Sequence, residues 1–252
     1  MVVFCSMLLF TSCEDFLAEK PYDFYDEQDF YKDVSELELA VNGAYEVLSQ
    51  KMTYGHFMLV NDCDTDLSHI KGSGTGHTAR DLGHYNIYTS HNWLEEAWGY
   101  YYTGIDRVNR IMANKERVDL PDEASQVTFK RLIAEARLLR GICYFDLVRM
   151  WGDVPLKLTA SDKTENFAVT RTNREEVYQQ IVDDMEAAVT DLPWYNEVSS
   201  YEGRPTKGAA MGLLARAYLF RAGYSLHQNG EMERPDNYLE SVSYTHLRAH
   251  ET

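Results

Sequence analysis

The stretch "AEARLLRGICYFDLVRMWGDVPL", residues 134–156, decides the fold of this 252-residue chain. Its apolar residues, together with Leu132 just before it, recur every three or four positions, which is the period of a helix with one buried face. That face collects Leu132, Ala136, Leu139, Cys143, Leu147 and Met150. The pair Pro121-Asp122 is a typical helix start, and Gly152 with Pro155 is a typical helix end. The pattern predicts one long amphipathic helix.

The same helix carries two sets of residues that suit a scaffold. Its polar side is expected to hold side chains that pair with neighbouring helices, namely Glu135, Arg137 and Arg140. A seam between helices is expected to be filled by the aromatic residues Tyr144, Phe145 and Trp151. These residues therefore indicate the fold rather than a binding site.

Further helices are predicted on both sides of this one. Their expected ranges are 35–50, 92–115, 172–192 and 206–223. The first starts with a capping box of Ser35 and Glu38, and the third with a capping box of Thr172 and Glu175. No convincing alternating strand pattern occurs, so the body of the chain is predicted to be all-α.

Small side chains are frequent in the later helices. They are Ala134, Ala136, Gly208, Ala209, Ala210, Gly212, Ala215 and Ala217. Small residues let helix axes approach closely, as in stacked antiparallel helix hairpins. The segment "LLARAYLFRAG" is similar to the second half of a tetratricopeptide-type unit, so a superhelix of helix pairs is predicted.

The N-terminal segment is predicted to be a secretion signal. Residues 1–10 are apolar apart from Ser6, and Thr11-Ser12 precedes Cys13 and an acidic pair. Ten residues are too few to span a bilayer, which takes about 20, but they fit the core of a signal peptide. The small-small-Cys ending resembles a lipobox, so we predict a signal over 1–12 and lipidation of Cys13. A frayed N-terminal helix is the alternative.

Beyond the signal, the chain divides into three parts. Residues 13–34 mix acidic and aromatic residues and are expected to be a tether. The helical domain is expected over 35–240. The final 241–252 continues no helix and resembles translated adapter sequence, so it is expected to be non-native and is set aside.

Composition narrows the functional classes. The chain is 44% hydrophobic, which is ample for a packed core. Its net charge is −16, and a strongly acidic surface repels phosphate backbones, which argues against nucleic-acid binding.

Residues 134–156 closely resemble the signature helix of the SusD/RagB family of starch-utilisation-type lipoproteins. The shared features are an Ala-Glu-Ala-Arg start, an aromatic-rich middle and a Gly-Asp-Val-Pro turn. Three further segments match in order: the "SCEDFL" lead at 12–17, a helix with Trp98, Tyr101, Ile105 and Asn109, and "GRPTKGAAMGLLARAYLF" at 203–220. The resemblance implies a tetratricopeptide-like helical fold about twice this length, with the C-terminal part missing here.

The resemblance also implies a function. Family members are surface-exposed lipoproteins of the outer membrane that capture oligosaccharides or polysaccharides for a SusC-like TonB-dependent transporter, without a cofactor or catalysis. Aromatic rings stack on sugar rings, and polar side chains bond the hydroxyls. In the loop 62–93 the candidate ligand residues are Asp64, Asp66, Arg80, Asn86, Tyr88, Asn92 and Trp93.

Other interpretations of these residues remain open. Trp93 also suits a core position at a helix start, and the polar candidates also suit an ordinary solvated loop. A glycosidase would need two carboxylates across a cleft, and 40 acidic residues make accidental pairs common. A protein-binding helical scaffold or a peptide-uptake lipoprotein are further alternatives.

Metal and nucleotide sites are less well supported. His69, His77, His84 and His91 are seven or eight residues apart, whereas structural zinc sites use short paired spacings. The "GSGTGH" segment at 72–77 lacks the strand, helix and Lys-Ser/Thr ending of a phosphate loop. We therefore expect no metal site.

Overall fold

The computed structural model describes residues 30–55, 65–68, 79–161, 169–197, 203–226 and 230–234. All of its helices belong to one unit, Tyr31–Thr252. The predicted signal, Cys13, nearly all of the predicted tether and the tail at 241–252 lie outside the described residues.

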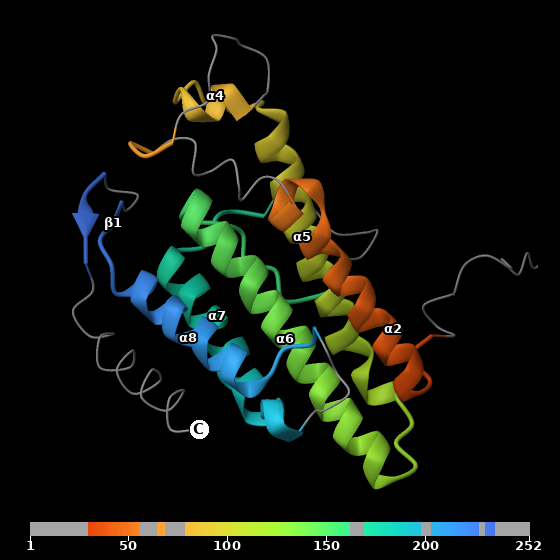
Figure 1. Cartoon of the computed structure of the whole chain (residues 1–252). Coiled ribbons are helices and arrows are strands. Elements are labelled where there is room, and N and C mark those ends of the chain that lie inside the picture. Colours follow the sequence, from red (N-terminus) through yellow and green to blue (C-terminus); the bar gives the residue numbers. More distant parts are fainter. Residues whose placement is uncertain are drawn as a thin grey trace, which may run out of the picture. The chain divides into compact units, whose positions relative to one another are not determined.

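The predicted long helix is confirmed as α6, Glu123–Trp151, which runs through the middle of the helical unit (Figure 1). Asp122 caps its start, because the carboxylate accepts a hydrogen bond from the Ser125 N–H at 2.7 Å. Gly152 ends it with a φ of 70°, a left-handed conformation that glycine adopts without steric cost. The start and end signals of the sequence therefore act where they were expected.

Four other long helices surround or extend this centre. They are α2 (Val34–Tyr45), α5 (Asn92–Asn114), α7 (Arg174–Asp191) and α8 (Lys207–Arg221). Helices α2, α5 and α7 pack on α6, and α8 packs mainly on α7. Contacts at two levels show that α5, α6 and α7 are successive antiparallel neighbours. Asn109 meets Arg140 and Trp98 meets Trp151 between α5 and α6, and Arg140 meets Asp184 and Asp153 meets Arg174 between α6 and α7. The shorter helical elements are η1 (Glu46–Ser49), η2 (Lys51–Gly55), α4 (Ala79–Gly83), η4 (Lys115–Arg117) and η5 (Tyr195–Glu197).

The all-α prediction is confirmed. Among the described residues, strand structure is confined to β1 (Ser225–Leu226) and β2 (Met232–Glu233), which pair antiparallel, and to one isolated bridge. The helices fold back on one another as hairpins, which is the arrangement that tetratricopeptide-like repeats use.

The first helix starts two residues before the predicted capping box. Asp33, rather than Ser35, is the N-cap, and its side chain accepts from the Glu36 N–H at 2.9 Å. The Glu36 carboxylate in turn accepts from the Lys32 N–H. Asp and Ser cap equally well, so the pattern alone did not decide between them.

The cap predicted at Thr172 is also wrong, by one residue. Asn173 is the N-cap of α7 and accepts from the Glu175 N–H at 2.8 Å. Thr172 instead pairs with Val154 in the isolated bridge, and its hydroxyl accepts from the Leu156 N–H. This bridge returns the chain to the end of α6 before α7 begins.

Close helix contacts occur at two glycines that the small-residue pattern did not single out. A Cβ on Gly104 would lie 3.1 Å from the Cys143 sulfur, and one on Gly141 would lie 3.1 Å from Met185 Cγ. By contrast, nothing lies within 4 Å of such an atom on Gly212. Close approach of the helices thus occurs at Gly104 and Gly141, which were not among the predicted small residues, and does not occur at Gly212, which was.

Glu135 does not lie on a polar side of α6 but is fully buried. Its carboxylate accepts from Arg131 at 2.9 Å, from Arg204 at 2.8 Å and from the Tyr45 hydroxyl at 2.9 Å. Burial, and then the neighbouring carboxylate, raise the pKa of Tyr45 above its usual range. One carboxylate therefore joins α2, α6 and the segment before α8, and the predicted pairing is confirmed in a buried setting.

Arg140 makes the second buried connection. Its guanidinium donates two hydrogen bonds to Asp184 on α7, at 2.7 and 2.8 Å, and a third to Asn109 Oδ1 on α5 at 2.8 Å. The side chains of Arg140 and Asp184 are 8% and 1% exposed. A bidentate geometry of this kind fixes both distance and orientation, so it sets the register of three helices.

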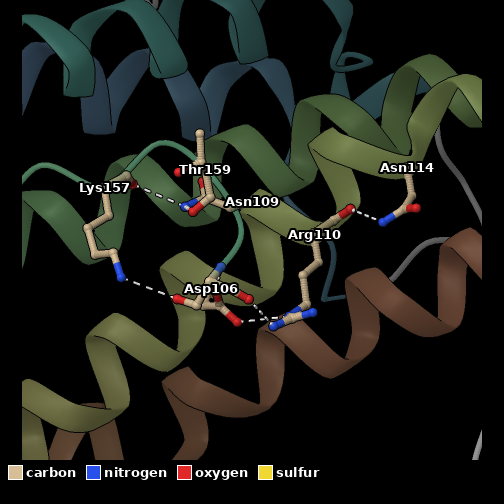
Figure 2. A network of polar contacts seen from close by, with 7 residues as sticks. Asp106, Asn109, Arg110, Asn114, Lys157 and Thr159 are labelled. Carbon is tan, nitrogen blue, oxygen red and sulfur yellow. Dashed lines mark hydrogen bonds and ion pairs between the residues drawn. The ribbon is translucent and has the colours of Figure 1, made fainter. Parts of the chain in front are cut away.

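Asn109, which accepts from Arg140, also binds the segment that follows α6 (Figure 2). Asn109 Nδ2 donates to the carbonyls of Lys157 and Thr159, at 3.1 and 3.0 Å. Asp106 accepts from the Ser161 N–H at 2.7 Å. These bonds satisfy backbone groups that have no partner in a helix or sheet, and they hold residues 157–161 along α5.

The buried pair between Arg140 and Asp184 generates a stability prediction. The Asp184→Asn variant leaves the guanidinium buried without its counter-charge, so we expect the free energy of unfolding to fall by about 3 to 5 kcal/mol. Urea unfolding followed by circular dichroism measures this. The control is Asp183→Asn, an exposed neighbour on the same helix, for which about 0.5 kcal/mol or less is expected. Equal losses in the two variants would contradict the assigned role.

A second prediction concerns pH. Burial acts to raise the pKa of Asp106, but hydrogen bonds from the Ser161 N–H and from Arg110 outweigh it and hold the pKa below its ordinary value of 3.8. Asp106 therefore stabilises the fold above about pH 3.8, and this contribution is lost as the pH falls through the folded-state pKa. We expect the stability difference between the unmodified protein and Asp106→Asn to shrink in that acidic range. Urea titrations at several pH values test this, and a constant difference would contradict it.

Candidate functional site

An open groove of about 520 Å³ lies beside the start of α5 and the end of α6. Its lining combines aromatic, aliphatic and polar side chains. These residues are Ile87, Tyr88, Thr89, Leu94, Glu95, Trp98 and Trp151. They come from three places in the sequence, so the groove exists only once α5, α6 and the loop before α5 are assembled.

Two tryptophans form one wall of the groove. The rings of Trp98 and Trp151 meet edge to face, with centroids 5.3 Å apart and an interplanar angle of 82°. Trp98 also contacts the ring of Tyr102 at 5.0 Å, and the Tyr102 hydroxyl donates to the Pro155 carbonyl at 2.7 Å. Both tryptophans are half-buried, so they are held by the core while part of each ring faces the groove.

Another part of the lining is supplied by residues 87–89 of the loop 84–91, which follows α4. Leu82 of α4 is buried in the core, and the Asp81 carbonyl accepts from the Asn86 N–H at 2.8 Å. The Tyr88 ring lies 5.6 Å from that of His91, a fully buried residue directly before α5. Tyr88 is therefore positioned by the helix start rather than by a freely extended loop.

The chemistry of the lining suits a ligand that has both apolar faces and hydroxyl groups. Tyr88, Trp98 and Trp151 offer broad aromatic surfaces, which stack on flat apolar faces. The exposed Glu95 carboxylate accepts hydrogen bonds, and the Thr89 hydroxyl both donates and accepts. A mainly apolar cleft with few polar groups is the usual form of a small-molecule site.

The predicted ligand residues do not all gather in this groove. Tyr88 lines it. Trp93 is half-buried against the core, with the Lys51 ammonium 5.8 Å from its ring centroid. Four polar candidates are exposed and lie outside this lining: Asp66, Arg80, Asn86 and Asn92. Asp64 lies outside the described residues, and the ligand role of each of the seven stays a prediction.

Sequence reasoning assigned Trp98 and Trp151 to the scaffold and did not propose Glu95. One signal was available: tryptophan is seldom fully buried, so a tryptophan near the end of each of two adjacent helices favours a partly exposed aromatic pair. The pairing of α5 with α6 was needed to place the two rings together.

Other candidate sites gain no structural support in the described part of the chain. There, no three His, Cys, Asp or Glu side chains come together as a metal site would require. His69, His77 and the 72–77 segment lie outside it. Cys143 carries a free thiol whose pKa is raised by burial, which agrees with its expected place in the core. No helix in the described part of the chain is long and apolar enough to cross a bilayer.

Solved structures define the class of this fold. A SusD homologue from Bacteroides thetaiotaomicron superposes with a TM-score of 0.78 and 27% identity, covering 90% of this chain and 42% of that protein. A laminarin-binding SusD-like protein superposes with a TM-score of 0.65 and 26% identity, covering 76% of this chain and 41% of that protein. The class is thus the tetratricopeptide-like helical proteins of the SusD type, as the signature helix predicted.

The family follows from the sequence match. The SusD-like family model, described as starch-binding and associating with the outer membrane, matches residues 15–219. The chain belongs to this family. A curated SusD-like protein from Bacteroides ovatus is 29% identical over 253 residues, which are 96% of this chain and 43% of that relative. The chain therefore spans about two fifths of the length of the curated relatives it matches.

Proposed function

We propose that this chain is part of an outer-membrane, surface-exposed lipoprotein that binds glycans and passes them to a SusC-like TonB-dependent transporter. The observation that carries the proposal is the groove with Tyr88, Trp98 and Trp151 in its lining. Sugar recognition by proteins uses such rings together with a few hydrogen-bonding groups. Membership of a family described as starch-binding supports the same function.

Binding without hydrolysis suits this groove better than catalysis. Glycoside hydrolysis generally uses two carboxylates about 5 to 9.5 Å apart on either side of the scissile bond. Among the described residues that line the groove, Glu95 supplies one carboxylate. The laminarin-binding relative shows that a protein of this fold binds a glycan.

The anchoring and the partner rest on other observations. The small-small-Cys sequence ending at Cys13 supports lipidation and attachment to the outer membrane. The family description, which includes association with the outer membrane, supports the same location. The transporter is proposed because the resemblance implies it.

Removal of the Tyr88 ring from the groove should weaken glycan binding. We expect Tyr88→Ala to raise the dissociation constant for a bound oligosaccharide about three- to tenfold, the value of one aromatic contact. Isothermal titration calorimetry measures it, after a glycan array has identified a ligand.

Tyr195→Ala is the matched control, because Tyr195 is 83% exposed on η5 and does not line the groove. It should leave the affinity unchanged. An equal loss in both variants, or no loss at Tyr88, would place the binding site elsewhere.

Lipidation has its own test. Cells that express the protein should incorporate radiolabelled palmitate through Cys13, and Cys13→Ala should abolish the label and release the protein from the membrane fraction. Cys5→Ala, within the predicted signal, is the control and should keep the label. Membrane attachment of the Cys13→Ala variant would count against a lipid anchor.

A further inference from the structure

The charge of the groove lining suggests which glycans the site accepts. Among the described residues that line it, Glu95 is the charged one. Its side chain is exposed in the first turn of α5, and Glu96 follows it on the same helix. The whole chain has a net charge of −16. The lining of the groove and the chain as a whole are thus both negatively charged.

Two positive groups of the described part of the chain lie near the groove but do not belong to its charged lining. The start of α5 contributes a partial positive charge of about half a unit, which is smaller than one carboxylate. The Lys51 ammonium lies over the Trp93 ring, and neither residue belongs to the described lining. The described lining therefore carries one formal negative charge, that of Glu95, beside its aromatic side chains.

Hydrogen bonding gives a second reason why an acidic glycan would bind less well here, and this reason does not depend on long-range electrostatics. An ionised Glu95 only accepts hydrogen bonds. The hydroxyls of a neutral sugar donate to it, but a uronate or sulfate group at neutral pH is itself only an acceptor. Such a group opposite Glu95 would both lose hydrogen bonds and suffer repulsion.

We infer that the groove binds glycans without acidic groups and discriminates against uronic-acid and sulfated glycans through Glu95. The inference rests on the proposed glycan-binding function and specifies its substrate class. Two unit charges 4 Å apart in water interact by about 1 kcal/mol, which corresponds to about fivefold in affinity. The interaction is larger where the groove excludes water, so fivefold is the smallest effect expected for a direct contact.

The test uses the purified protein on an array of neutral, uronic-acid and sulfated glycans. The neutral ligand that binds best is then compared with its C6-oxidised form, in which a hydroxymethyl becomes a carboxylate and the linkage is unchanged. We expect at least about fivefold weaker binding of the oxidised form at low ionic strength. The ratio should shrink at about 1 M salt, where the Debye length is about 3 Å.

Variants identify the residue responsible. Glu95→Gln should lower the neutral-to-acidic affinity ratio at least about threefold, whereas Glu96→Gln, which removes the same charge from the next exposed position, should leave it near that of the unmodified protein. A change of equal size in both variants would overturn the role of Glu95 and assign the effect to net charge.

The failure of the inference and that of the proposed function are separable. Preferential binding of uronic-acid or sulfated glycans, or an unchanged ratio in Glu95→Gln, overturns the inference while glycan binding stands. Absence of binding to every glycan on the array overturns the proposed function and the inference together.

Discussion

The structure depends on one buried contact, in which the Arg140 guanidinium meets Asp184 and Asn109. A buried cation is costly without a partner, and a bidentate carboxylate supplies one only at a fixed distance and angle. Because the three residues lie on α5, α6 and α7, no one of these helices can slide along another without breaking the contact. Apolar packing alone would tolerate several alignments of these helices along one another. The core provides the stability, and the polar contact selects one alignment.

The groove is a consequence of that register. Trp98 lies on α5 and Trp151 at the end of α6, and their rings touch only because the two antiparallel helices are aligned. The segment after α6 is held along α5 through Asn109, and its Pro155 carbonyl in turn holds Tyr102 beneath Trp98. The aromatic wall is thus formed by the fold itself, which would lower the entropy lost in the proposed binding.

Periodicity was sufficient to predict the long helices, because α5 buries a regular apolar face and the apolar stripe of α6 is buried as well. It did not predict that α6 is buried on nearly all sides between 131 and 148, so this helix is not amphipathic as expected. It could not choose between Asp33 and Ser35 as a cap, since both side chains accept the same hydrogen bond. It also placed Glu135 on a polar surface, because a charge in a sequence does not reveal partners that are distant along the chain, here Tyr45 and Arg204. In the site, Tyr88 was predicted from local composition, whereas Trp98 and Trp151 required the tertiary pairing of two helices.

The tryptophans that form the wall also belong to the segments that define the fold. Each ring is half-buried, so part of it stabilises the helix pair while the rest faces the groove. Substitution at either position is therefore expected to change the fold together with the shape of the groove. Tyr88 and Glu95 are less constrained, because one lies on the loop before α5 and the other on an exposed first turn. If the proposed function holds, variation in ligand preference on this scaffold should concentrate at such positions, while the indole pair would supply a stacking surface common to many sugars.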